Sequence, residues 1–279
     1  MAERGGRRRR TWVFVAIAAV VLAGGLLVRA LWPQDRATRV EADEALDRFH
    51  DTTTSAAPTT TAAPTTVMVT EPQPLRQLPA TGVYRYATTG SESVDILGGA
   101  THDYPAETLL TVTHDGCGVL LRWDLLEQRR DEWRLCVTDA GVELQTAGAH
   151  YHEFYSNGRL EKLACTATVL LVPTTDTLPP EQAVTCLLDG EPWDPTWTAV
   201  ARETLTVDGI AVATVHVRMV VDSGDAHFER TTTDWWLAPS GLPVRMTTEK
   251  TSNTDSGVIG DVYYTETYTA DLTSFQPLT

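Results

Sequence analysis

Two histidines separated by one residue, His150 and His152, have a spacing that could support chemistry. If this segment is a β-strand, both imidazoles lie on one face of the sheet, and Glu153 follows them. A metal site would need a third ligand, and the other candidate histidines are remote in the sequence. We therefore expect hydrogen-bonded or exposed histidines and assign no catalytic residue, no metal ligand and no cofactor. The alternative is an envelope enzyme, metal-dependent or not, that uses His150 and His152.

Other residues of catalytic type stand in patterns typical of turns and solvated faces. His102 precedes an aspartate as many turn residues do, and His216 alternates with Arg218 on the polar face of an expected strand. The neighbouring acids Asp131 and Glu132 would face opposite ways on a strand, which makes them a poor acid–base pair. The sequence contains no Gly-x-Ser-x-Gly elbow and no phosphate-cradling loop before a helix. We expect a non-catalytic domain.

The pair Trp235-Trp236 is the most distinctive aromatic feature of the chain. Adjacent side chains on a strand face opposite sides, so one indole can fill a core while the other covers the second face or lines a cleft. A curved sheet with an apolar concave face can enclose a hydrophobic ligand. We predict that one indole lies at the edge of an apolar surface open to a ligand or partner. Core packing of the indoles is the simpler alternative.

The four cysteines, Cys117, Cys136, Cys165 and Cys186, predict disulfides in an extracytoplasmic domain. Of the three pairings that four cysteines allow, we favour Cys117–Cys136 and Cys165–Cys186, because both loops are short. Strand alternation places Cys117 and Cys136 on opposite faces of a regular hairpin, so this pair needs a bulge or a strand end. A Cys₄ zinc site is disfavoured because no closely spaced cysteine pairs occur.

The elements that position these residues begin with an expected membrane anchor. Residues 12–32 run from one tryptophan to another and contain a single charge, Arg29. A helix of this length spans the roughly 30 Å hydrocarbon core. The arginine-rich residues 1–11 predict a basic tail held in the cytoplasm, which places the rest of the chain outside. The alternative is a signal peptide cleaved before Gly24.

Two further segments separate this anchor from the expected domain. Residues 33–50 are highly charged, and their apolar stripe of Val40, Leu46 and Phe49 is thin. This pattern favours a solvated juxtamembrane helix without a partner. Residues 51–79 are rich in threonine and proline, which predicts an extended, disordered stalk.

Residues 80–279 predict an all-β domain built as one large, curved antiparallel sheet of half-barrel or barrel-like form. Asp208-Gly209 lies between two apolar runs and predicts a tight hairpin. In the last expected strand, the inner face is assigned to Val262, Tyr264 and Tyr268. The expected strands are 83–89, 108–114, 118–126, 132–138, 204–208, 210–221, 227–238, 243–251 and 258–272.

The charge of the chain is unevenly distributed. The net charge is -15, of which residues 1–79 contribute +2 and residues 80–279 contribute -17. A surface this acidic repels the phosphate backbones of nucleic acids. We therefore expect no nucleic-acid partner. The expected partners are the lipid bilayer, through the N-terminal helix, and an apolar envelope ligand or a protein.

The segment 228–248 contains Asp-Trp-Trp-Leu, a Pro-Ser-Gly turn and Leu-Pro-Val-Arg. It resembles the terminal hairpin of the lipoprotein-carrier half-barrel superfamily. The whole plan resembles single-pass envelope proteins of high-GC Gram-positive bacteria. The carrier resemblance implies a half-barrel that binds acyl chains through generic apolar lining, so it assigns no ligand residue here. The chain departs from soluble carriers by its permanent anchor. Two functions follow: a structural or interaction module, or a binder of an apolar envelope ligand.

Overall fold

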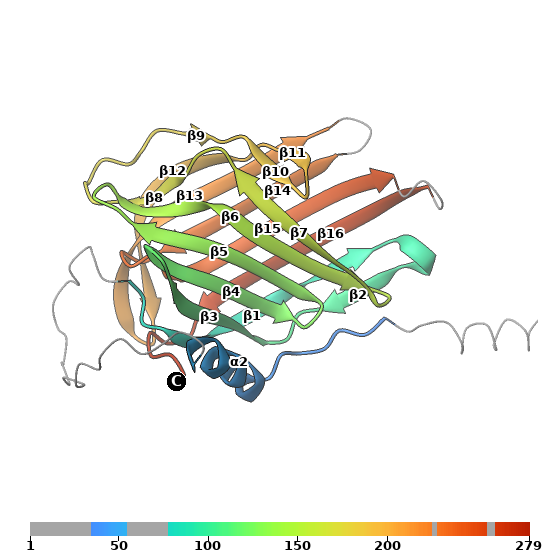
Figure 1. Ribbon diagram of the computed structural model, residues 1–279, viewed down its shortest axis with the longest axis horizontal. Coiled ribbons are helices and arrows are strands. Elements are labelled where there is room, and N and C mark those ends of the chain that lie inside the picture. Colours follow the sequence, from blue (N-terminus) through green and yellow to red (C-terminus); the bar gives the residue numbers. More distant parts are fainter. Residues whose placement is uncertain (1–34, 55–77, 225–227, 256–259) are drawn as a thin grey trace, which may run out of the picture. The chain divides into compact units, whose positions relative to one another are not determined.

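The computed structural model describes residues 35–54, 78–224, 228–255 and 260–279 (Figure 1). Residues 37–279 form one compact unit, a curled sheet that carries helix α2 (Ala42–Thr54) on its outer face. The expected cytoplasmic tail, the expected transmembrane helix and most of the expected stalk lie outside the described residues. None of the helices within the described ranges is both long and apolar enough for a membrane span.

The described sheet has sixteen strands, all paired in antiparallel fashion. They are β1 (Gly82–Val94), β2 (Ala100–Asp103), β3 (Glu107–Asp115), β4 (Gly118–Leu126), β5 (Arg129–Val137), β6 (Gly141–Phe154), β7 (Asn157–Cys165), β8 (Val169–Pro173), β9 (Gln182–Ala183), β10 (Cys186–Leu188), β11 (Glu191–Trp193), β12 (Thr196–Val207), β13 (Ile210–Ser223), β14 (Glu229–Leu237), β15 (Pro243–Asp255) and β16 (Asp261–Leu272). A short 3-10 turn, η1 (Ile96–Gly98), follows β1.

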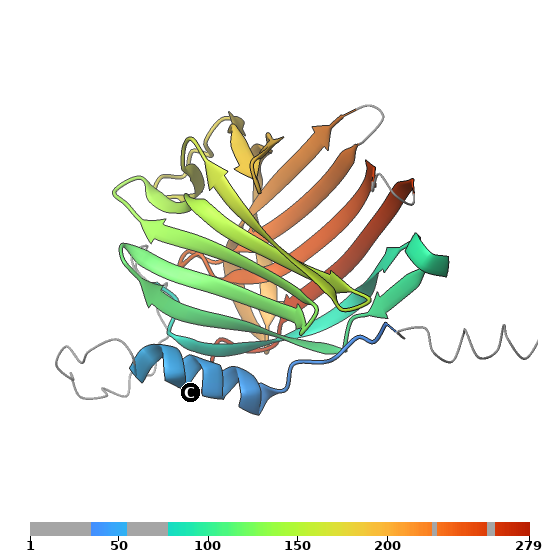
Figure 2. The ribbon, with the colours of Figure 1, turned by 45° about the vertical axis from the view of Figure 1, so that its right-hand side comes forward.

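The strand order bends this sheet into a half-barrel with two walls. The order is β11-β10-β7-β6-β5-β4-β3-β1-β16-β15-β14-β13-β12-β9, with β2 on β1 and β8 on β6. Figure 2 shows the earlier strands, in green, curving toward the later strands, in orange and red. The pairing of β1 with β16 joins the two walls. The expected half-barrel of antiparallel strands is therefore confirmed.

Local sequence accounts for the regular parts of this sheet. β4 has the bounds that alternation predicted, and Val119, Leu121 and Trp123 on it are fully buried. Asp208 and Gly209 both have positive φ, 48° and 77°, and connect β12 to β13 as the expected two-residue turn. The expected inner residues of β16 also line the concave side.

One end of the half-barrel is closed by the turn between β14 and β15. Gly241 in this turn has a φ of 85°, and a Cβ atom built on it would lie 2.9 Å from Cγ1 of Val142 on the opposite wall. Only glycine allows this close approach. On another side, the Gln182 side chain of β9 hydrogen-bonds to both the N–H and the carbonyl of Leu170 in β8. These contacts draw the two walls together.

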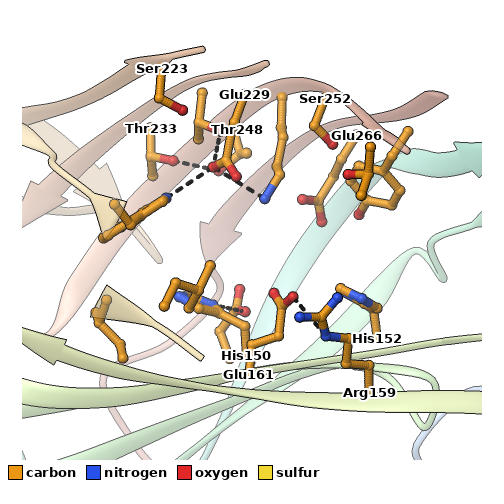
Figure 3. A pocket seen from close by; sticks show the side chains of 18 of the residues that line it. His150, His152, Arg159, Glu161, Ser223, Glu229, Thr233, Thr248, Ser252 and Glu266 are labelled. Atoms are coloured by element: carbon orange, nitrogen blue, oxygen red, sulfur yellow. Dashed lines mark hydrogen bonds and ion pairs between the residues drawn. The ribbon is translucent and has the colours of Figure 1, made fainter. Parts of the chain in front are cut away.

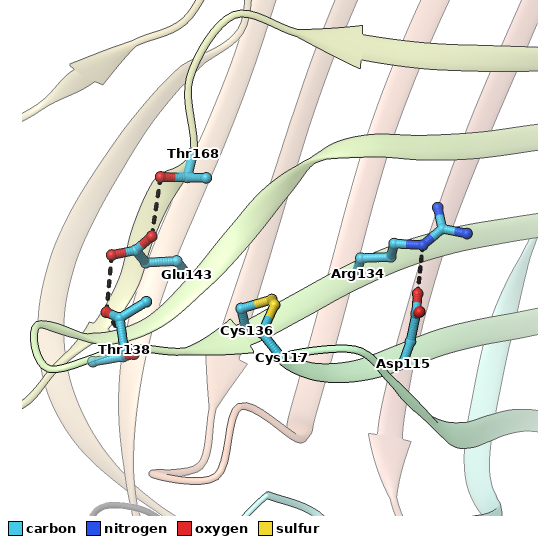
Figure 4. Close-up of a disulfide and its surroundings, with 8 residues drawn as sticks. Asp115, Cys117, Arg134, Cys136, Thr138, Glu143 and Thr168 are labelled. Carbon is cyan, nitrogen blue, oxygen red and sulfur yellow. Dashed lines mark hydrogen bonds and ion pairs between the residues drawn. A yellow bond between two sulfur atoms is a disulfide. The ribbon is translucent and has the colours of Figure 1, made fainter.

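Both expected disulfides are present. Cys165 and Cys186 lie directly opposite each other on β7 and β10. Cys117 lies in the turn between β3 and β4, next to Gly118, which pairs with Cys136 (Figure 4). The first bridge therefore forms at a strand end, which resolves the conflict of strand faces noted in the sequence.

The expectation of a solvated helix without a partner is wrong. Helix α2 packs against the outer face of β1 and β3, where Val40, Ala45 and Phe49 are buried against Val83 and Leu109. The helix also begins at Ala42 rather than at residue 33 and continues to Thr54. The sequence interpretation counted only Val40, Leu46 and Phe49 as apolar residues of this stripe. Ala45 widens it enough to pack against the sheet.

Polar contacts fix the same helix to the sheet. Arg48 of α2 lies 3.3 Å from the buried Asp124 carboxylate, and Arg39, just before the helix, lies 3.1 Å from Glu107. The folded unit therefore starts near residue 37 and not at the expected boundary of residue 80. Helix α2 is therefore part of the folded domain, and residues 55–77, the main part of the expected stalk, lie outside the described residues.

Candidate ligand-binding cavity

The concave side of the half-barrel holds a cavity of about 780 Å³. Side chains of β5, β6 and β7 form one side of it, and side chains of β13 to β16 form the other. Figure 3 shows His150, His152 and Arg159 on one wall and Glu229 and Thr248 on the other. The cavity has an apolar region and a polar region.

Four of the eight tryptophans in the chain form the apolar region. They are Trp133, Trp193, Trp197 and Trp235. Trp235 lies edge-on between Trp133, at 5.1 Å between ring centroids, and Trp197, at 5.6 Å. Leu144, Leu163 and Met219 line the same region. Such edge-to-face packing holds the indoles rigidly, so the apolar wall is preformed.

The polar region is built around Arg129, whose side chain is only 10% exposed. Its Nε donates to Glu266 Oε1 at 3.0 Å, and its Nη1 donates to Asp131. Burial acts to raise the pKa of Asp131, but the Arg129 guanidinium and His150 outweigh it and hold that pKa well below its usual range. Two carboxylates from opposite walls thus share one buried cation.

His150 and His152 both line the cavity, so the expectation that they share a face of one strand is confirmed. His150 Nδ1 lies 2.7 Å from Asp131 Oδ1. Burial, together with the nearby charges of Arg129 and Lys250, lowers the pKa of His152 to about 3. His152 is therefore a neutral imidazole at physiological pH.

A second ion pair lies on the opposite wall. Lys250 Nζ is 3.2 Å from Glu229 Oε1, and Glu229 also accepts hydrogen bonds from Trp193 Nε1 at 3.1 Å and Thr231 at 2.9 Å. Burial raises the pKa of Glu229, but Lys250 and these hydrogen bonds outweigh it and lower that pKa overall. The bond from Trp193 on β11 to Glu229 on β14 ties the two walls across the cavity.

His102 is buried in β2 and is not the turn residue that the sequence suggested. Its Nδ1 lies 2.9 Å from Glu92, and its ring stacks on Phe154 at 4.5 Å between centroids. Tyr264 donates to the other oxygen of Glu92 at 2.8 Å. Burial raises the pKa of Glu92, which favours its protonated form beside the cavity.

The two adjacent tryptophans lie on opposite faces, as strand geometry predicted. Trp235 is 2% exposed and lines the cavity, so the indole beside the apolar surface is the buried one. Trp236 is half-buried on the outer face, where its Nε1 donates to Glu203 at 3.0 Å and its ring stacks on His216. The binding of a ligand to the apolar surface beside Trp235 stays a prediction.

The expectation of a solvated His216 is wrong. Its ring is buried between Glu203, 3.1 Å from Nδ1, and Asp234, 2.6 Å from Nε2. Arg218 also donates to Asp234, at 2.8 Å. A polar position on a strand can be covered by its neighbours, and alternation alone does not reveal this.

The sequence did not reveal that charged residues such as Arg129, Glu229, Lys250 and Glu266 line the cavity. A signal for one of them was present, because Glu266 stands between Tyr264 and Tyr268 on the expected inner face of the last strand. A charged residue in an inward position indicates a buried ion pair or a binding site. β6, which carries His150 and His152, was missed because its alternation is weak, and β7 was missed for the same reason.

Within the described parts of the chain, no group of three or more His, Cys, Asp or Glu side chains is arranged to hold a metal ion. A scan against protein-family models, a search of curated proteins and a search of solved structures each found no match to this chain. The half-barrel fold is therefore established from the structure itself, whereas membership of the carrier superfamily is not.

Proposed function

We propose that the half-barrel binds an amphiphilic ligand of the cell envelope. The observation that carries this proposal is the cavity of about 780 Å³, in which a preformed tryptophan wall adjoins a polar region of paired charges. Ligand pockets for small molecules typically have about 300–1,000 Å³ and combine apolar walls with a few polar groups. An acyl or similar chain would lie against the tryptophans, and a polar group would lie beside the histidines and Lys250.

A purely structural or interaction module is the competing function. Such a module gains stability by filling its interior, since an unfilled apolar cavity costs free energy. The wall between Trp133, Trp197 and Trp235 instead lines open space. This arrangement favours binding over a purely structural role.

The proposed setting is outside the cytoplasm, beside a membrane. Two disulfides are typical of an oxidising compartment. The apolar residues 12–32 and the arginines before them support a single-pass anchor with a cytoplasmic N-terminus. A permanently anchored binder would present or hold its ligand at the membrane and would not carry it away by diffusion.

Mass spectrometry of organic extracts from the purified full-length protein tests the binding function. Met219→Trp would fill the cavity from β13, because Met219 is one of its lining residues. Val220→Trp is the matched control, since Val220 lies on the outer face of the same strand and is 37% exposed. We expect an amphiphile in extracts of the wild type and of Val220→Trp, and its loss in Met219→Trp. Equal extracts from all three proteins would contradict the proposal.

A second candidate function is acid–base catalysis by His150 on a bound molecule. The observation that favours it is the 2.7 Å contact between Asp131 and His150 Nδ1, which leaves Nε2 as the remaining nitrogen for proton transfer. Within the residues that the structure describes, no serine, threonine or cysteine hydrogen-bonds to His150, so a nucleophile would come from the substrate or from water. Turnover of the extracted ligand that is lost in His150→Gln would support this function.

A further inference from the structure

The charges of the cavity wall indicate which head group the ligand carries, and this inference rests on the proposed binding function. We propose that the cavity selects an amphiphile with an uncharged polar head that both donates and accepts hydrogen bonds. It would discriminate against fatty acids and other anionic amphiphiles, and against alkylammonium compounds.

The cations of the lining are already neutralised by carboxylates. Arg129 binds Asp131 and Glu266, and Lys250 lies 3.2 Å from Glu229. Arg159 lies 3.2 Å from Glu161 and also contacts Asp189. At Arg129 and Lys250, an anionic head would have to displace one of these carboxylates, which would leave that carboxylate in the cavity wall without its partner. The Arg159 side chain is 55% exposed, so an anion beside it would stay in water. The wall therefore offers no ready site for an anion.

The same pairing works against a cationic head. The inward carboxylates Asp131, Glu229 and Glu266 are each engaged by a cation. Glu161 is engaged by Arg159, and the other acids of the lining, Glu191 and Asp255, are exposed, so a cation beside them would stay in water. An ammonium group that entered the cavity would lose its hydration without gaining an unengaged buried carboxylate.

Neutral groups are what the polar region offers to a ligand. Burial and the surrounding cations keep the His152 imidazole uncharged, and within the described chain no hydrogen bond is formed by its ring. The hydroxyls of Thr231, Thr233 and Thr248 lie on the opposite side of the cavity. Thr231 donates to Glu229, and Thr233 and Thr248 lie 3.2 Å from each other, but each of these hydroxyl oxygens can still accept a further hydrogen bond. An imidazole and hydroxyls can each donate or accept, which suits a hydroxyl or amide head.

A competition experiment tests this selectivity. The full-length protein in phosphatidylcholine nanodiscs is incubated with equal amounts of 1-monolaurin, laurate and dodecylammonium, which share one chain length. The pH is chosen so that both ionic probes are charged. Bound probes are quantified by mass spectrometry, and nanodiscs with Met219→Trp give the background from the bilayer. We expect monolaurin to exceed either ionic probe by about tenfold.

A gain of binding separates charge pairing from general damage. Glu229→Gln keeps the shape of the side chain and frees Lys250, so bound laurate should rise by about fivefold. Asp222→Asn is the matched control, because it frees Arg230 from a 3.6 Å contact at a solvent-exposed position. This control should leave all three probes unchanged.

The outcomes distinguish the two proposals. If none of the three probes binds above background, the binding function itself is contradicted. If all three bind equally, or an ionic probe binds best, the binding function stands and the inference about the head group is overturned. Laurate binding that does not change in Glu229→Gln would also overturn it, because pairing of Lys250 would then not be the cause.

Discussion

The two faces of the sheet carry clusters of nearly the same composition in different surroundings. The inner cluster consists of Arg129, Asp131, His150 and Glu266, and the outer cluster consists of Glu203, His216, Arg218 and Asp234. In each, a histidine lies within 2.7 Å of an aspartate that also binds an arginine. The Arg129 side chain is 10% exposed, whereas that of Arg218 is 47% exposed.

This difference shows that burial decides what such a cluster can do. In the outer cluster, the side chains of Arg218 and Glu203 are 47% and 39% exposed, so water screens their charges and the ion pairs that they form contribute little stability. In the inner cluster, the desolvated charges depend on one another, and they border a cavity. Residue types alone would assign both clusters the same role.

Removal of the central arginine should produce the largest contrast between the two clusters. Arg129→Leu leaves Asp131 and Glu266 buried without their cation, so we expect a loss of about 3–5 kcal/mol in the free energy of unfolding. Arg218→Leu should cost at most about 1 kcal/mol. Urea denaturation of both variants measures the difference. Equal losses would mean that burial does not distinguish the clusters.

The two adjacent tryptophans extend the comparison to packing. Trp235→Ala should cost about 3 kcal/mol, because it removes a buried indole between two others. Trp236→Ala should cost about 1 kcal/mol, since it loses one hydrogen bond and a stacking contact on the outer face. Thermal and urea unfolding of both variants test this order. Large and equal losses would identify both indoles as core residues.

The neutral His152 predicts a dependence of stability on pH. Its pKa of about 3 in the folded protein lies below its ordinary value, so between these values the unfolded chain binds a proton that the folded protein does not. Stability should therefore fall as the pH decreases through this range, by at most roughly 1.4 kcal/mol per pH unit.

His152→Gln should remove this contribution. We compare the free energy of unfolding of the variant with that of the wild type at each pH. This difference should shift in favour of the variant by about 1–2 kcal/mol between neutral pH and about pH 5. His216→Gln is a control from the outer cluster, where His216 has carboxylates on both sides. Denaturation curves across this pH range measure the effect, and an unchanged pH slope in His152→Gln would contradict a neutral, half-buried imidazole.

The smallest expected effect concerns ligand binding. His150→Gln alters a polar group of the cavity wall and should weaken monolaurin binding by about two- to fivefold. His216→Gln alters the corresponding residue of the outer cluster and should leave binding unchanged. The competition assay in nanodiscs measures both variants. An equal loss in the two would indicate a general effect on the sheet and not a contact with the ligand.

Much of the architecture could be predicted from the sequence because local patterns encode it. Alternation defined β4 and the inner face of β16, and Asp208-Gly209 defined a hairpin. Short loops between cysteines indicated both disulfides. Alternation also placed Trp235 and Trp236 on opposite faces, and His150 with His152 on the same face. Each of these inferences depends on neighbours in the chain or on one hairpin.

Only the tertiary structure decided what lies opposite each face. Alternation shows that Glu266 points inward, but not that it meets Arg129, which is 137 positions away in the sequence. It likewise gave no sign that α2 would cover Val83 and Leu109, or that neighbours would bury His216. These contacts arise from the curvature of the whole sheet, which depends on the twist and register of many strands together. The sequence alone therefore assigned residues to faces, whereas the folded sheet determined their partners, their burial and the cavity between the walls.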